Sequence, residues 1–158
     1  AFAVEFEWIF NPVYPMPHLE KLFAACRASN VAMGIISNAQ FYTPHLFNLF
    51  FDSSPKKLGF DPDLTFYSYA CGCAKPSTFM FKAAADRLQQ RDIPTRSTLY
   101  VGNDMLNDIF PAQETGFSTA LFAGDARSLR LRKDHPACRH LSADLIITDL
   151  LQILDHIV

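Results

Sequence analysis

The feature that most constrains how this chain can fold is a short apolar run followed by a polar residue, repeated three times. Ser37 follows VAMGII, Lys75 comes just past TFYSY, and Asp104 follows TLYVG. Runs of this length suit strands that are buried on both faces, as the strands of parallel sheets are. Between the runs, apolar residues recur at helical spacing. The sequence therefore predicts an α/β fold with a mainly parallel sheet.

Two carboxylates follow the third run. Asp104 and Asp108 lie four residues apart at the start of an expected helix, so they share one face, and Asn103 beside them adds an amide oxygen. Hard oxygen donors at the end of a buried strand suit Mg²⁺. The ordinary alternative is that acids in a first helical turn cap the helix and stabilise its dipole. Gly102, directly before them, permits a close approach and favours the metal site.

A cation and a hydroxyl follow the other two runs. Lys75, between a strand and a helix that starts with Pro76, is placed to hold an anion as a point charge. Ser37 and Asn38 come directly after a strand, where a hydroxyl and the N–H groups of a helix N-terminus bind anions. Taken singly, a solvated lysine and a helix cap are the ordinary interpretations. Because the carboxyl ends of parallel strands meet at one edge, the three signals together predict one site for an anion and a divalent cation.

Further elements are expected from spacing. Apolar residues predict a helix over residues 2–10, and the proline-rich stretch NPVYPMP after it predicts a hinge. The remaining expected elements are a helix over 17–29, a helix with Pro44 in its first turns, a helix opened by Pro76, a helix ended by Gly116, the strands STALF and DLIIT, and a closing helix LLQILDHI.

Composition excludes several classes of protein. The 158 residues, 49% of them hydrophobic, suffice for one packed domain. A net charge of −2 gives no reason to expect a nucleic-acid partner, no run is long enough to span a membrane, and AFAVEFEWIF does not resemble a signal peptide. Four cysteines without metal or redox spacing indicate free thiols in a reducing compartment, the cytoplasm. One basic cluster is interpreted as a solvated surface helix: Arg127, Arg130, Arg132 and Lys133.

The segments IISN, KPSTFMF and YVGNDMLND resemble the second, third and fourth motifs of the haloacid dehalogenase-like (HAD) hydrolase superfamily, over residues 15–158. The resemblance implies a Rossmann-like core and a Mg²⁺-dependent phosphatase that acts on a small phosphorylated metabolite through an aspartyl-phosphate. The chain departs from the family at Gly102-Asn103-Asp104, where members often have Gly-Asp. Either Asn103 or Asp104 can then face the metal, and the four-residue spacing to Asp108 favours Asp104.

The resemblance also implies roles for the candidate residues. Ser37 would bind the transferring phosphoryl group, and Asn38 beside it is a further candidate for substrate binding. Lys75 would steady the phosphate and the nucleophile. Asp104, with Asp108 behind it, would hold Mg²⁺.

The family's first motif, an apolar strand that ends in Asp-x-Asp-x-Thr, is not present at any expected strand end. A literal match from Asp61 to Thr65 follows PKKLGF, and its Asp-Pro step predicts a turn. We therefore expect the nucleophile to lie upstream of Ala1 and the chain alone to be inactive. Residues 1–14 are then the last helix and hinge of a helical cap domain, and residues 15–158 are the hydrolase core.

Loss of the family's central first strand would expose two strand edges and an apolar stripe. A second chain, a swapped strand, or direct closure of VAMGII onto TLYVG could fill the gap.

Two other functions stay open. A metal-free 2-haloacid dehalogenase is compatible with Ser37-Asn38, although two carboxylates without a cation would repel its substrate. A non-catalytic binding protein could keep the fold, but it would need neither Lys75 nor the acidic pair.

Overall fold

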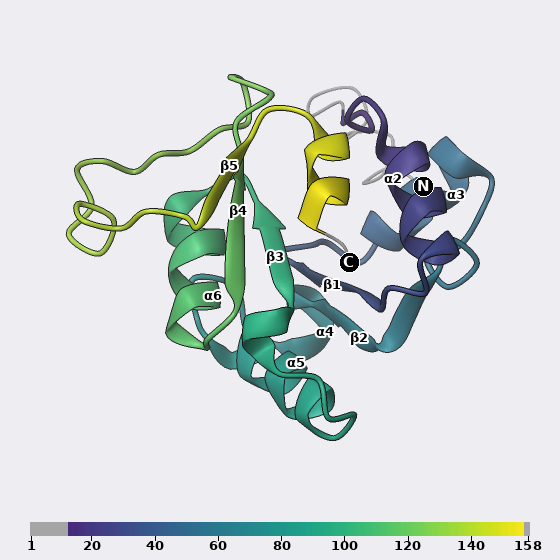
Figure 1. Cartoon of the computed structure of the whole chain (residues 1–158), viewed down its shortest axis with the longest axis horizontal. Coiled ribbons are helices and arrows are strands. Elements are labelled where there is room, and N and C mark those ends of the chain that lie inside the picture. The colour runs from purple at the N-terminus through teal and green to yellow at the C-terminus, as the bar shows by residue number, and fades with distance from the viewer. Residues whose placement is uncertain (1–12, 157–158) are drawn as a thin grey trace.

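The computed structural model describes residues 13–156, and its strands form two separate parallel sheets (Figure 1). The first sheet pairs β1 (Met33–Ser37) with β2 (Phe60–Tyr67). The second sheet orders three strands: β3 (Leu99–Gly102), β4 (Ser118–Phe122) and β5 (Leu145–Ile147). The predicted α/β class with parallel strands is confirmed.

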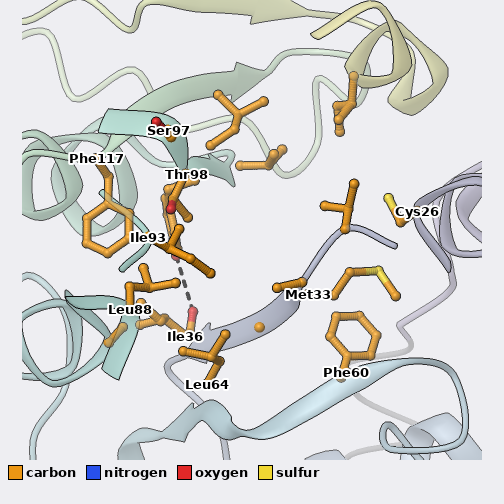
Figure 2. A pocket seen from close by; sticks show the side chains of 18 of the residues that line it. Cys26, Met33, Ile36, Phe60, Leu64, Leu88, Ile93, Ser97, Thr98 and Phe117 are labelled. Atoms are coloured by element: carbon orange, nitrogen blue, oxygen red, sulfur yellow. Dashed lines mark hydrogen bonds between the residues drawn. The ribbon is translucent and has the colours of Figure 1, made fainter. Parts of the chain in front are cut away.

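A groove separates the two sheets, because β1 and β3 do not pair among the described residues. The hypothesis that VAMGII closes directly onto TLYVG is therefore wrong. Figure 2 shows the groove, a cavity of about 410 Å³ that Met33 and Ile36 of β1 share with Thr98 just before β3. β1 is half-buried rather than buried on both faces as predicted, since the groove runs along it. Most of the lining is apolar, and it includes Cys26, Phe60, Leu64, Leu88, Ile93 and Phe117.

Helices cover both faces of the sheets. α2 (Leu19–Ala28) forms where a helix was predicted. The helix predicted over residues 2–10 lies outside the described residues. Within residues 13–156, no helix has both the length and the apolar character needed to cross a membrane. The other helices are α3 (Thr43–Phe51), α4 (Ser68–Cys71), α5 (Phe79–Gln89) and α6 (Phe110–Glu114), with the 3₁₀-helices η1 (Thr95–Ser97) and η3 (Leu150–His156) and the π-helical turn η2 (Met105–Ile109).

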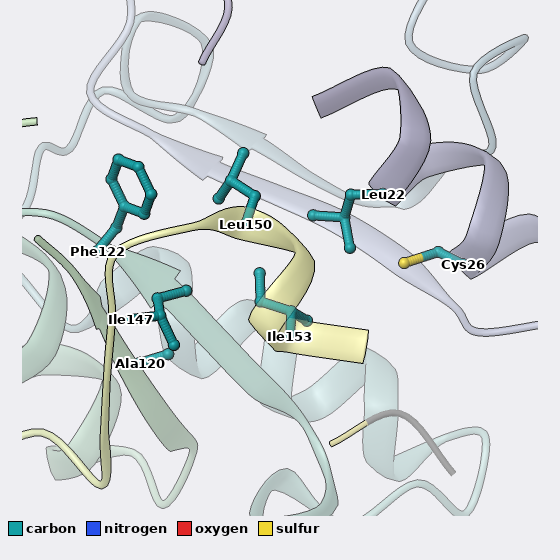
Figure 3. Close-up of a cluster of buried hydrophobic side chains, with 7 residues drawn as sticks. All are labelled: Leu22, Cys26, Ala120, Phe122, Ile147, Leu150 and Ile153. Atoms are coloured by element: carbon teal, nitrogen blue, oxygen red, sulfur yellow. The ribbon is translucent and has the colours of Figure 1, made fainter. Parts of the chain in front are cut away.

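One hydrophobic core lies between α2, η3 and the second sheet (Figure 3). Each aliphatic side chain buried in such a cluster contributes about 1.5–3 kcal/mol. Met33 of β1 and Leu99 of β3 pack against the cluster, so it holds both sides of the groove. Its buried members are Leu22, Cys26, Ala120, Phe122, Ile147, Leu150 and Ile153.

A second core holds the opposite faces of the sheets. Successive strand residues point to opposite faces, so Tyr100 of β3 faces away from the cluster that Leu99 and Val101 contact. Phe81 of α5 is fully buried and packs against Tyr100 with ring centroids 4.8 Å apart. Leu64 of β2 belongs to the same cluster. α5 therefore connects the two sheets on this face.

The segment around Asp61 and Asp63 forms part of β2, so the prediction of a turn there is wrong. A shift in the register against β1 accommodates these residues, and Asp63 N–H still donates to Asp61 Oδ1 at 2.9 Å. Arg91 forms ion pairs with both carboxylates, and its hydrogen bond is the main reason that the pKa of Asp61 is lowered. Both acids lie near the amino end of β2, whereas Ser37 pairs with Tyr67 at its carboxyl end.

Residues 123–143 form a long loop between β4 and β5 (Figure 1), and the surface helix predicted around Arg127 is wrong. The backbone of Arg130 instead bonds to the segment after β3. Its N–H donates to the Asn103 carbonyl at 2.8 Å, and its carbonyl accepts from the Met105 N–H at 2.9 Å. These long-range bonds use the backbone groups that a helix would pair locally.

Candidate active site

Lys75 lies at the centre of the candidate active site. Its Nζ donates to Asp108 Oδ1 at 2.5 Å, to the Tyr100 hydroxyl at 3.0 Å and to the Ile36 carbonyl at 3.2 Å. The side chains of Lys75 and Asp108 are 10% and 7% exposed. A buried ion pair with these additional hydrogen bonds holds the ammonium at one point beside the end of β1.

Asn38 holds the backbone of Lys75 in place. Its Oδ1 accepts from the Lys75 N–H at 2.7 Å, and its Nδ2 donates to the Lys75 carbonyl at 3.0 Å. The amide thus bonds to the lysine backbone as a neighbouring strand would. Close by, Ser68 Oγ accepts from the Ala39 N–H at 3.0 Å and joins the same two segments. Asn38, which we predicted to contact substrate, uses its side-chain amide to position the backbone of the lysine.

Asp108 receives hydrogen bonds on both carboxylate oxygens. Besides the lysine, Oδ1 accepts from the Tyr100 hydroxyl at 3.1 Å. Oδ2 accepts from the backbone N–H groups of Asn103 and Asp104, each at 3.0 Å. The carboxylate thereby ties the turn after β3 to the end of β1.

Tyr100 belongs to the site although its residue type did not suggest a role. Its hydroxyl lies 3.2 Å from the Ile36 carbonyl and contacts both members of the ion pair. Burial, and then the charge of Asp108, raise the pKa of Tyr100 well above the ordinary value for tyrosine. The hydroxyl therefore stays protonated and able to donate. The available sequence signal was a polar atom in the otherwise apolar run TLYVG.

Asp104 caps the turn η2 and pairs with Arg132. Its Oδ1 accepts from the N–H groups of Leu106 at 2.9 Å and Asn107 at 3.2 Å. Its Oδ2 accepts from Asn107 Nδ2 at 3.0 Å and from Arg132 Nη2 at 2.7 Å. Burial would raise the pKa of this carboxyl, but the Arg132 guanidinium and the two N–H groups outweigh burial and lower it. Helix capping, the ordinary alternative for this acid, describes its contacts.

We expect Arg132→Met to lower the free energy of unfolding at neutral pH, because it leaves a largely buried carboxylate without its cation. The folded-state pKa of Asp104 lies below its unfolded value. The pair's contribution is thus present above the unfolded pKa and is lost as pH falls through the folded pKa. Urea unfolding at neutral and acidic pH, with Arg127→Met as control, measures this. An equal loss at both pH values would contradict it.

The described residues do not complete a metal site. Within residues 13–156, no group of three or more Asp, Glu, His or Cys side chains is placed to hold a metal ion. Asp104 and Asp108 both accept hydrogen bonds from protein donors on each oxygen. Asn103 Nδ2 donates to the Ser128 carbonyl at 2.7 Å, which leaves its Oδ1 without a protein donor among the described residues. One neutral oxygen does not hold Mg²⁺, so the ion would need oxygen ligands from elsewhere.

A polar cavity of about 410 Å³ brings the predicted residues together. The ends of β1 and β3 and the segment after α4 converge there, as the ends of parallel strands do. Four lining residues were not predicted, and two of these are arginines of the loop 123–143 that we had assigned to a solvated helix. The lining consists of the predicted Ser37, Asn38, Lys75, Asn103, Asp104 and Asp108, and of Asn107, Ser128, Arg130 and Arg132.

Parallel strands with a polar cavity at their carboxyl ends define an α/β protein of the Rossmann-like class, whose ligand site lies at the edge of the sheet. A family model described as HAD-hydrolase-like matches residues 72–153, which is more than half of the chain. The chain therefore belongs to the HAD-like hydrolases. A comparison with curated proteins finds no match.

Solved structures share the fold. The HAD phosphatase of Thermococcus onnurineus matches 88% of this chain with a TM-score of 0.62 and 18% identity, and the chain covers 57% of it. The magnesium-bound HAD-hydrolase candidate YfnB of Bacillus subtilis matches 90% of this chain with a TM-score of 0.63 and 17% identity, and the chain covers 54% of it. A 2-haloacid dehalogenase of Pseudomonas syringae pv. Tomato DC3000 matches 92% of this chain with a TM-score of 0.58 and 18% identity, and the chain covers 54% of it. The chain thus spans little more than half of each protein, and the likeness establishes the fold alone.

Proposed function

We propose that this chain is the core of a HAD-type hydrolase that cleaves a small phosphomonoester through an aspartyl-phosphate. The observation that carries the proposal is the Lys75–Asp108 pair, held at 2.5 Å where the ends of β1 and β3 line the polar cavity. The positive charge of a buried ammonium at this place favours the approach of an anionic substrate and of an attacking carboxylate. Membership of the HAD-like hydrolases supports the reaction type.

In this proposal the nucleophile lies on a further strand that fills the groove between the two sheets. Ser37 and Asn103 both line the polar cavity, so β1 and β3 end on the same side. A strand between them would pair with the backbone groups of both edges and would end beside Lys75. The apolar lining of the groove supports this, because it suits a strand buried on both faces.

The proposed chemistry proceeds in two steps. A carboxylate oxygen of the inserted strand attacks phosphorus, and the bond from phosphorus to the leaving-group oxygen breaks, with a proton supplied by the strand's second carboxyl group. Lys75 neutralises charge on the attacking carboxylate and the phosphoryl group, while the Ser37 hydroxyl donates to a phosphoryl oxygen. Water then gives a proton to the second carboxylate and attacks phosphorus, and the bond from phosphorus to the aspartyl oxygen breaks, which releases inorganic phosphate and restores both groups.

Mg²⁺ enters this proposal only for the completed site. The described residues offer the Asn103 amide oxygen, and a cation at Asp104 would have to displace Arg132. The magnesium-bound YfnB structure supports a metal requirement in a protein of similar fold. The steps above assign no role to the ion.

The same proposal includes the domain boundaries, the partner and the cellular location. Residues 15–158 are the catalytic core and residues 1–14 the end of a cap domain, with a phosphorylated metabolite rather than nucleic acid as partner. A cytoplasmic location is supported by the state of the cysteines, which are all free thiols: Cys26, Cys71, Cys73 and Cys138.

The proposal is tested by fusing the chain to a strand that carries the nucleophile. We expect a chain joined through a flexible linker to an apolar strand that ends in Asp-x-Asp to hydrolyse an aryl phosphate at least about 100-fold faster than the chain alone. A matched fusion ending in Asn-x-Asn should stay at background. Assays with and without Mg²⁺ separate the metal requirement from the nucleophile. Turnover by the chain alone, or equal rates for both fusions, would overturn the proposal.

A metal-free 2-haloacid dehalogenase is the second candidate, because Arg132 rather than an open position faces Asp104. Its signature is chloride release from a 2-chloroalkanoate by the completed chain without Mg²⁺, with no aryl phosphate hydrolysis. If the fusion neither hydrolyses the aryl phosphate nor releases chloride, a non-catalytic HAD-fold binding protein is favoured instead.

A further inference from the structure

The loop 123–143 places Arg130 at a defined position on the rim of the polar cavity. Its backbone bonds to Asn103 and Met105 on both sides, at 2.8 and 2.9 Å. One step earlier, the Ser128 carbonyl accepts from Asn103 Nδ2 at 2.7 Å. The loop is therefore joined to the same turn that carries the acidic pair.

Apolar contacts also hold this loop against the rest of the fold. Leu129 and Leu141 pack against a small core of their own, beside Met105 and Ile109, and Cys138 of the loop is itself buried there. Burial of these side chains stabilises the position of the loop beside the cavity. Three polar residues of the loop line the cavity: Ser128, Arg130 and Arg132.

The cavity holds more positive than negative charge. Lys75 is paired with Asp108 at 2.5 Å, and Arg132 is paired with Asp104 at 2.7 Å. Arg130 also lines the cavity, but none of the ion pairs within residues 13–156 includes it. Its Nη1 donates to two carbonyls of its own loop, and no described residue accepts from Nη2 or Nε. One cation with free donors thus remains at the rim.

We propose that Arg130 binds a second anionic group of the substrate, so that the substrate is a phosphomonoester which also carries a carboxylate or another phosphate. This inference rests on the proposed function, because it takes Lys75 and Ser37 as the site of the transferred phosphoryl group. An arginine suits the role, since its planar guanidinium presents paired N–H groups to a carboxylate or phosphate. Arg130 and Lys75 line the same cavity, so the proposal places one small molecule in contact with both.

Direct binding measured by calorimetry tests the inference, with inorganic phosphate, glycerol phosphate and phosphoglycerate as probes. The two organic probes differ by a carboxylate in place of a hydroxymethyl group. We expect phosphoglycerate to bind roughly five- to tenfold more tightly than glycerol phosphate. Arg130→Ala should remove that preference, and Arg130→Lys should restore part of it. Arg127→Ala, an exposed arginine of the same loop outside the cavity lining, should leave it unchanged.

The outcomes separate this inference from the proposed function. Equal affinities for the two organic probes, or a preference that survives in Arg130→Ala, would refute the role of Arg130 and leave the phosphate site intact. If none of the three anions binds, the phosphate site itself is absent and both proposals fail.

Discussion

Lys75→Met is expected to lower the free energy of unfolding by about 3–5 kcal/mol, because it leaves the buried Asp108 carboxylate without its cation. The pair is nearly excluded from solvent, so water cannot replace the ammonium. In a domain of this size that loss corresponds to a fall in Tm of about 10 °C. Thermal unfolding followed by circular dichroism measures it. The same change should abolish hydrolysis by the chain completed with its nucleophile strand.

The control for this change is Lys82→Met, which removes an exposed lysine from α5 and should alter Tm by little. A double variant with Asp108→Asn should recover at least half of the lost stability, since no unpaired charge then stays buried. If Lys75→Met and Lys82→Met have the same Tm, or if the double variant is the least stable of the three, the Lys75–Asp108 pair does not stabilise the fold as expected.

Gly102→Ala is expected to have the second large effect, near 3 kcal/mol of destabilisation, as overpacking at a tight contact does. A Cβ at this position would lie 2.5 Å from the Asp108 Cγ, far inside van der Waals contact. Asp108 must then move, which breaks its bonds to Lys75 and to the backbone after β3. Urea unfolding gives the stability, and loss of phosphate binding reports the displaced carboxylate.

Gly72→Ala is the matched control. A Cβ there would meet no atom within 4 Å, although the φ of +67° adds a cost of about 1 kcal/mol for any residue other than glycine. Phosphate binding should survive in this variant. A Gly102→Ala protein that is as stable as Gly72→Ala, with phosphate binding intact, would show that the close approach at Gly102 has no functional importance.

Strongly periodic segments were predictable from the sequence. The spacing of Leu22 and Cys26 indicated α2, the run STALF became β4 without change, and Gly116 ends the helical segment before β4 with a φ of +82°. Such patterns depend on residues within one or two helical turns of each other, so they can be recognised from the sequence alone. The segment at Asp61 was harder, because the pairing of β2 with β1 overrode a local preference for a turn.

The candidate site was predictable in part for a similar reason. Ser37, Lys75 and Asp108 each follow an apolar run, and parallel strands bring such positions to one edge. Tyr100 gave a weak signal, since only its hydroxyl distinguishes it from the apolar residues around it. Arg130 and Arg132 gave a misleading one, because a charged, exposed cluster usually belongs to a solvated helix.

The residue pattern was enough to specify the α/β class and the polar residues at its strand ends, since both follow from short-range periodicity. The break between β1 and β3, the pairing of Arg132 with Asp104, and the return of loop 123–143 to the cavity depend on three-dimensional packing. Arg132 and Asp104 are 28 residues apart, and Asn38 and Lys75 are 37 apart. Contacts over such separations form only when the whole core packs, so no local stretch of chain encodes them.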